Sequence, residues 1–95
     1  MKPAVKTILI AACMAASAIA RPQSGEEFAK AKCLRCHAID QKKIGPSFKE
    51  ISAAHRDDKG AEAQLLGNLK SGKGHPKIEA PDAQLKGVIQ YVLKQ

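Results

Sequence analysis

The sequence predicts a small all-α domain of about four helices. Two Ser-x-x-Glu capping boxes, at Ser24 and Ser47, each mark the start of a helix. Near the carboxyl end, apolar residues recur with the i, i+3, i+4, i+7, i+8 spacing of an amphipathic helix. No strand pattern, internal repeat or linker is visible, so residues 21–95 are predicted to form one domain.

Residues 1–20 have the features of a secretory signal peptide rather than of a folded element. Lys2 and Lys6 form a positive segment, small and apolar residues follow, and Ala18-Ile19-Ala20 matches the small-x-small cleavage pattern, which predicts cleavage after Ala20. The alternative is a lipoprotein-type cleavage before Cys13. The apolar run is shorter than the roughly 20 residues that span a bilayer, so no stable membrane insertion of the mature chain is expected.

The first helix of the mature chain is expected over about residues 25–33, after the Ser24 cap. Phe28 is its only large apolar residue. We therefore expect Phe28 to pack against the C-terminal helix.

The pentapeptide Cys33-Leu34-Arg35-Cys36-His37 follows, with the Cys-x-x-Cys-His spacing of covalent haem attachment. Two thiols three residues apart can reach both vinyl groups of one porphyrin, and the next histidine can then bind the iron. A thiol–disulfide redox centre, a zinc site completed by His55 or His75, and a small structural disulfide are alternatives. Haem is favoured because no strand precedes the motif, no second cysteine pair exists, and a mature chain of about 75 residues gains a core from a cofactor.

Ile44-Gly45-Pro46 interrupts the helical pattern soon after the motif. We expect this loop to fold back beneath the haem, with Ile44 against the ring and the Pro46 carbonyl accepting the imidazole N–H of His37. An ordinary surface turn is the alternative.

Two further helices are expected before the last one. The helix after Ser47 should turn Phe48 and Ile51 inward and end near Ala54. The next should cover about residues 61–70 and stop at Gly72. Its three leucines share one side and are expected to line the haem pocket: Leu65, Leu66 and Leu69.

The last helix follows a loop that contains His75-Pro76. Pro81 suits its first turn, and Asp82 suits the positive end of the helix dipole. Its inward face is predicted to carry five apolar residues: Leu85, Val88, Ile89, Val92 and Leu93.

Over about residues 24–94, this order of features resembles the class I c-type cytochromes, especially the short bacterial monohaem electron carriers. The resemblance implies a small cytochrome c fold wrapped around one covalent haem c. By position it implies that Cys33 and Cys36 hold the haem, that His37 binds iron with support from Pro46, and that Phe28 and Tyr91 lie where the first and last helices cross.

The sixth iron ligand departs from the family pattern. These cytochromes generally supply a methionine, often followed by proline, from the loop before the last helix, but here Met1 and Met14 are the only methionines. His75 stands in that loop and Pro76 follows it, so we expect His37/His75 coordination. The alternatives are His55, a lysine such as Lys73 or Lys77, or an open position. Imidazole favours ferric iron more than a thioether does, so the reduction potential should be lowered.

We therefore expect a periplasmic electron-transfer protein and not an enzyme. The formal charge of +7 includes Lys2 and Lys6, and the remaining positive charge should favour redox partners with acidic docking surfaces. Nucleic-acid binding is not expected, because the chain has three aromatic residues and no recognition motif. The alternatives are a haem-based binder or sensor of small gaseous ligands, with an open or displaceable sixth position, and a subunit of a larger oxidoreductase.

Overall fold

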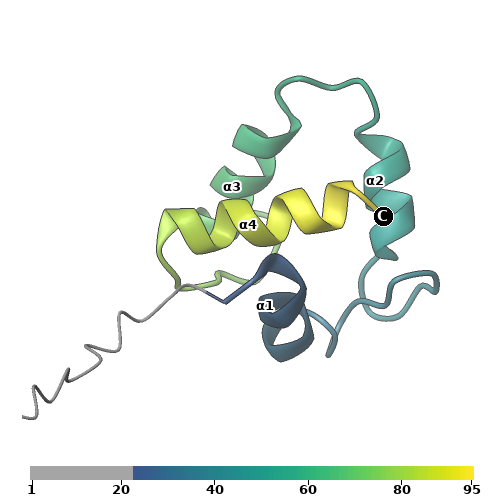
Figure 1. The fold of residues 1–95 in the computed structure, drawn as a ribbon, viewed down its shortest axis with the longest axis horizontal. Coiled ribbons are helices and arrows are strands. Elements are labelled where there is room, and N and C mark those ends of the chain that lie inside the picture. Colours follow the sequence, from purple (N-terminus) through teal and green to yellow (C-terminus); the bar gives the residue numbers. More distant parts are fainter. Residues whose placement is uncertain (1–22) are drawn as a thin grey trace, which may run out of the picture.

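The computed structural model of the protein describes residues 23–95, which form four helices and no strand (Figure 1). The expected signal peptide, its cleavage after Ala20 and the alternative cleavage before Cys13 lie outside the described residues. The predicted all-α fold is confirmed. The helices are α1 (Gly25–Lys32), α2 (Phe48–Ala54), α3 (Ala61–Ser71) and α4 (Asp82–Leu93).

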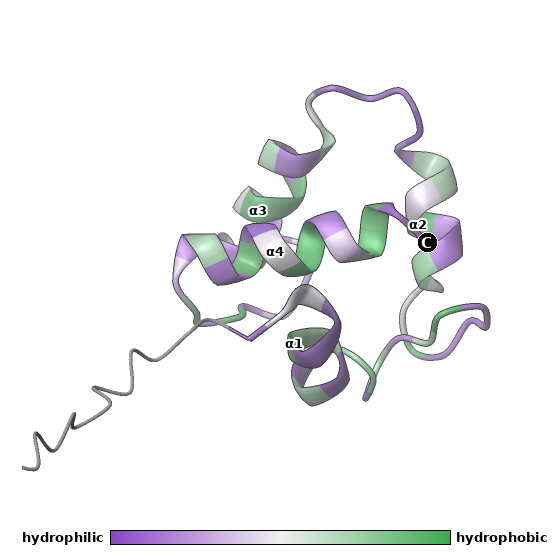
Figure 2. Cartoon of the chain, in the orientation of Figure 1, coloured by the Kyte–Doolittle hydropathy of each residue, from purple (hydrophilic) through white to green (hydrophobic). Residues whose placement is uncertain are grey.

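Helix α4 is the element on which the other three pack. It contacts α1, α2 and α3, and within residues 23–95 these three helices do not pack against one another. Figure 1 shows α4 crossing the middle of the fold, and Figure 2 shows apolar residues recurring along it. Leu85, Val88 and Val92 of α4 join Phe28 of α1 and Phe48 of α2 in one core cluster, so the predicted packing of Phe28 on α4 is confirmed.

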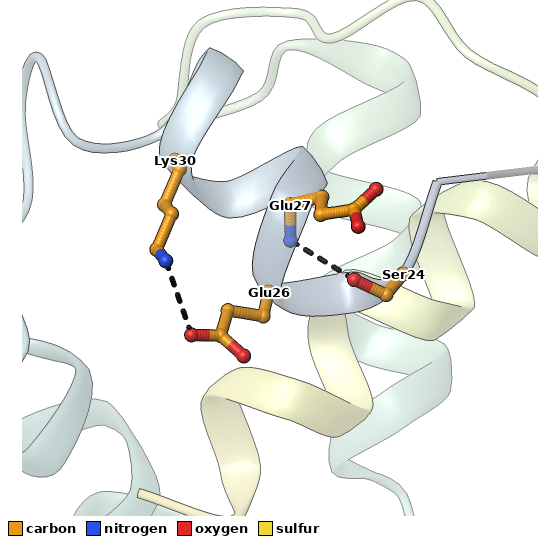
Figure 3. A network of polar contacts seen from close by, with 4 residues as sticks. All are labelled: Ser24, Glu26, Glu27 and Lys30. Carbon is orange, nitrogen blue, oxygen red and sulfur yellow. Dashed lines mark hydrogen bonds and ion pairs between the residues drawn. The ribbon is translucent and has the colours of Figure 1, made fainter.

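Serine caps fix the starts of two helices. The Ser24 hydroxyl accepts a hydrogen bond from the Glu27 backbone N–H at 3.2 Å (Figure 3), and the Ser47 hydroxyl accepts one from the Glu50 N–H at 3.0 Å. Each cap satisfies a backbone donor that has no partner within its helix. At the other end of α3, Gly72 adopts a left-handed conformation with φ of 72°, which stops the helix as predicted.

Pro81 lies just before α4 rather than in its first turn. With φ of −58° and ψ of 146° it is still extended, although its carbonyl already accepts the N–H groups of Gln84 and Leu85 at 2.9 and 3.1 Å. It is therefore the N-cap residue, and Asp82 opens the helix. Pro81 therefore stands one residue before the predicted position, because its ψ of 146° is extended rather than helical.

Helices α1 and α4 cross in close contact at Gly25. A Cβ atom at Gly25 would overlap the Gly87 carbonyl and lie 2.8 Å from the Tyr91 Cβ. The Tyr91 ring meets Phe48 edge-on, with centroids 6.2 Å apart. The crossing thus brings Tyr91 against α1, as expected. No helix within residues 23–95 has the length and apolar character needed to cross a membrane.

Candidate haem site

A cavity of about 600 Å³ opens between the helices, and residues from all four helices and the intervening loops line it. Most of the lining side chains are apolar, including Phe48, Leu69 and Val88. The structure brings to this one cavity all six residues predicted to bind the haem or its iron: Cys33, Cys36, His37, Ile44, Pro46 and His75. An apolar cavity with a few convergent polar groups is the usual form of a cofactor site.

The turn after α1 places the two cysteines and the histidine together. The Cys33 carbonyl accepts the backbone N–H of Cys36 at 3.2 Å and that of His37 at 3.0 Å, so the pentapeptide continues as a tight turn beyond the helix. Both thiols are half-buried and are not joined by a disulfide.

The environment of Cys33 differs from that of a redox dithiol. Burial raises the pKa of the Cys33 thiol above its usual value. The reactive cysteine of a dithiol centre usually has a lowered pKa, often at a helix N-terminus, whereas Cys33 caps the C-terminus of α1. A zinc site would need four ligands, and residues 23–95 hold no suitable group of three or more His, Cys, Asp or Glu side chains. These observations favour haem over the two alternatives.

The Ile44-Gly45-Pro46 loop lies directly against His37. The Nδ1 atom of His37 is 2.6 Å from the Pro46 carbonyl oxygen, so Nδ1–H donates to that oxygen and Nε2 is left to bind a metal. A Cβ at Gly45 would lie 2.5 Å from the His37 Cε1, which means that the ring rests on the glycine backbone. The Gly45 N–H in turn donates to the Cys36 carbonyl at 2.7 Å. The predicted hydrogen bond to Pro46 is confirmed.

Ile44 contributes to the cavity wall although 82% of its surface is exposed. It follows Lys43, whose Nζ donates to the Leu34 carbonyl at 2.9 Å. The two contacts of this segment with the pentapeptide, through Lys43 and Gly45, hold Ile44 beside the cavity.

His75 faces His37 across the cavity. The two imidazole centroids are 6.0 Å apart, and the ring planes differ by 11°. Nδ1 of His75 lies 2.7 Å from the Pro76 carbonyl oxygen, so this ring also has its Nδ1–H bound to the backbone. A metal–imidazole bond is about 2.0 Å. Two imidazoles that each pointed a ring nitrogen at one metal would therefore have centroids about 6 Å apart, which is close to the observed 6.0 Å.

The other proposed ligands are placed less favourably. His55 lines the cavity, but its Nδ1 lies 3.7 Å from an oxygen of Asp58. Lys73 and Lys77 are absent from the cavity wall, and the Lys77 amine lies 3.7 Å from Glu79. Of the two histidine candidates for the sixth position in the described part of the chain, His75 is the one whose ring lies near His37 and nearly parallel to it.

The prediction for α3 needs one correction. Leu65 and Leu69 line the cavity, but Leu66 does not; it packs against the core cluster instead. Successive helical residues are rotated by about 100°, so Leu66 points to the side of α3 that meets the core.

Sequence reasoning did not predict several cavity residues. Asn68 follows Leu65 by one helical turn, so the helical period could have placed it on the cavity wall. For Lys32 and Ile78, which also line the cavity, no local pattern points to that position.

Comparisons with known proteins agree with the geometry. No protein-family model matches the chain. It is 37% identical over 79 residues to a cytochrome c-551 from Azotobacter vinelandii, across 75% of this chain and 96% of the relative. It is 37% identical over 70 residues to a cytochrome c-551 from Pseudomonas aeruginosa, across 66% of this chain and 67% of the relative.

A solved structure shares the fold. The class 1 cytochrome MtoD from Sideroxydans lithotrophicus ES-1 matches with a TM-score of 0.69 and 26% identity, over 74% of this chain and 90% of that one. From these relatives it follows that the cofactor of this chain is covalently bound haem c with its iron. It also follows that the chain is an electron-transfer protein and not an enzyme. The chain belongs to the class I monohaem c-type cytochromes, the group of the cytochromes c-551 and c-552.

Proposed function

We propose that this cytochrome is a periplasmic electron carrier whose iron is held between His37 and His75. The observation that carries the proposal is a pair of nearly parallel imidazoles in one apolar cavity, with ring centroids 6.0 Å apart. The haem supplies the one-electron chemistry. The chain binds it and orients the two ligands.

Each proposed site residue has a distinct role. Cys33 and Cys36 form the two thioether bonds, and His37 and His75 bind the iron. Ile44 and Pro46 support the haem on the side of His37. The carbonyls of Pro46 and Pro76 each hold an Nδ1–H, which orients both rings and increases the basicity of both Nε2 atoms.

The exchange of a thioether ligand for an imidazole should lower the reduction potential. Two imidazole ligands stabilise ferric iron more than one imidazole and one thioether do. We therefore propose a potential below that of cytochromes with a methionine ligand. Spectroelectrochemistry of His75→Met should show a higher potential than that of the wild-type protein.

Positive charge near the haem site supports redox partners with acidic docking surfaces. Lys32 lines the cavity, and Lys43 is fixed to the pentapeptide through the Leu34 carbonyl. Charges at such a rim mainly increase the rate of association, and salt screens them. Electron transfer to an acidic partner should therefore slow as ionic strength rises.

The proposed location and domain boundary depend on export. Residues 1–20 would be the signal peptide, and residues 21–95 would be the haem domain. The intact mass of the protein purified from a periplasmic extract tests both: it should equal the chain from Arg21 plus one haem. A mass that retains residues 1–20 would contradict the cleavage site.

The ferric spectra of three holoproteins test the ligation. Wild-type protein should be low-spin with a bis-imidazole signal in electron paramagnetic resonance, His75→Ala should become high-spin, and His55→Ala, the matched control, should remain low-spin. A high-spin wild-type spectrum, together with rapid carbon monoxide binding after reduction, would instead support a binder of gaseous ligands. Loss of the low-spin signal in His55→Ala alone would move the sixth ligand to His55.

A further inference from the structure

The segment that carries His75 is closed at both ends by the last turn of α3. The Gly72 N–H donates to the Asn68 carbonyl at 3.0 Å, and the Ile78 N–H donates to the Leu69 carbonyl at 2.9 Å. Two consecutive carbonyls therefore hold the start and the end of one short arch, residues 73–77, with His75 at its centre. Gly72 and Gly74, with φ of 72° and 70°, provide the reversal of direction.

One side chain fixes the far end of this arch. Ile78 packs against the core cluster and lines the cavity, whereas Lys73, Gly74, Pro76 and Lys77 are exposed. It follows His75 by three residues, so a shift of Ile78 would move the backbone that carries the imidazole.

A second contact near the arch contributes less to its position. Lys70 and Asp82 form an ion pair at 3.0 Å that joins the end of α3 to the start of α4. Both side chains are about half exposed, and exposed ion pairs add little stability. Beyond its backbone hydrogen bonds, the arch is therefore held mainly by apolar contact with the core, first at Ile78 and then at Ala80.

We propose that Ile78 is a positioning residue for the sixth iron ligand: its anchorage in the core keeps the arch short and holds His75 on the iron. The proposal rests on the His37/His75 ligation proposed above. Ala80 is the next residue that packs against the core, so release of Ile78 would lengthen the free segment from residues 73–77 to residues 73–79. Lengthening a flexible loop in this proportion lowers its closure probability by about 1.7-fold.

The experiment measures how readily an external ligand replaces His75. Ferric holoprotein is titrated with cyanide and, separately, with imidazole, and the absorption change gives the apparent affinity. Ile78→Ala should bind both ligands about 1.7-fold more tightly than wild-type protein, or more if the backbone bond from Ile78 also weakens. Ile78→Val, a smaller truncation, should give an intermediate rise and keeps the test available if Ile78→Ala folds poorly.

Leu66→Ala is the matched control. Leu66 also packs against the core as an aliphatic residue, but it lies outside the cavity wall. It should lower stability without changing either affinity. An equal rise in Leu66→Ala would overturn the proposal, because the effect would then reflect general destabilisation.

Two further outcomes separate the possible failures. If Ile78→Ala gains affinity for imidazole only, a larger cavity rather than a loosened arch explains the result, and the positioning role is wrong. If wild-type protein is low-spin and Ile78→Ala is unchanged, this inference alone fails. A high-spin wild-type protein would overturn the His75 ligation and this inference together.

Discussion

Gly25 and Gly87 meet where α1 crosses α4, and replacing each with alanine should change stability in opposite directions. At Gly25 the new Cβ would overlap the Gly87 carbonyl and lie 2.8 Å from the Tyr91 Cβ and 2.9 Å from the Gly87 carbonyl carbon. At Gly87 nothing lies within 4 Å of the position that a Cβ would take. The same methyl group therefore meets backbone at one position and open space at the other.

The magnitudes follow from these contacts. Backbone atoms cannot move away as a side chain would, so we assign Gly25→Ala a cost of about 3 kcal/mol, the upper part of the usual overpacking range. The gain in helix propensity returns at most about 1 kcal/mol, which leaves a net loss of about 2 kcal/mol. Gly87→Ala should gain about 0.5–1 kcal/mol, because it lies within α4 and creates no clash.

Thermal and denaturant unfolding of the two holoproteins, followed by far-ultraviolet circular dichroism, tests the pair. For a domain of this size, 1 kcal/mol corresponds to about 4–8 °C in Tm. Gly25→Ala should lose about 8–16 °C and Gly87→Ala should gain a few degrees. Gly67→Ala, another helical glycine with nothing within 4 Å, is a second control and should also gain stability. Equal stability of Gly25→Ala and wild-type protein would refute the close helix crossing.

Three further substitutions probe the site and its supports. Gly45→Ala would place a Cβ 2.5 Å from the His37 ring, so we expect a loss of about 1–3 kcal/mol and an altered ferric spectrum; an unchanged spectrum would contradict the contact. Ser47→Ala removes the cap on the Glu50 N–H and should cost about 1 kcal/mol in chemical unfolding while leaving the spectrum unchanged. Lys70→Gln breaks the half-exposed pair with Asp82 and should cost under about 1 kcal/mol at low salt. Its unfolding curve should approach that of the wild-type protein at high salt, and a larger, salt-independent loss would contradict a solvent-exposed pair.

Helix ends were the most predictable part of the fold, because local chemistry determines them. Ser24 and Ser47 satisfy donors three residues ahead, and Gly72 adopts a backbone conformation that other residues avoid. Such signals act within one helical turn and can be read from the sequence. These signals place a helix end to within about one residue: Pro81 was expected in the first turn of α4 and is its N-cap.

The site was predictable in part. The spacing of Cys33, Cys36 and His37 reflects the chemistry of attachment, so the motif identified them directly. The meeting of His75 with His37 required the fold, and only the likeness to the cytochromes suggested it. Ile78 was not predicted, because one isoleucine in an irregular loop has no periodic pattern to show that it reaches the core.

Distances between helices were the least predictable feature. The helical period gave the apolar side of α3 but not where the cavity and the core lie around it, so it could not show that Leu66 meets the core without lining the cavity. The contact of Gly25 with Gly87 and Tyr91 joins residues more than sixty positions apart. A Cβ would meet backbone at Gly25 and open space at Gly87 because of how α1 and α4 cross. Neither helix's own sequence determines that crossing.

The central position of α4 has a consequence for the order in which the chain folds. Every helix–helix interface in residues 23–95 includes α4, and α4 is synthesised after the other three helices. No tertiary contact between these helices can therefore form until α4 is available, and these contacts join distant parts of the chain, which slows folding. We expect the Cys33–His37 segment to stay accessible until α4 has formed, so that both thiols can react with haem before the chain closes around it.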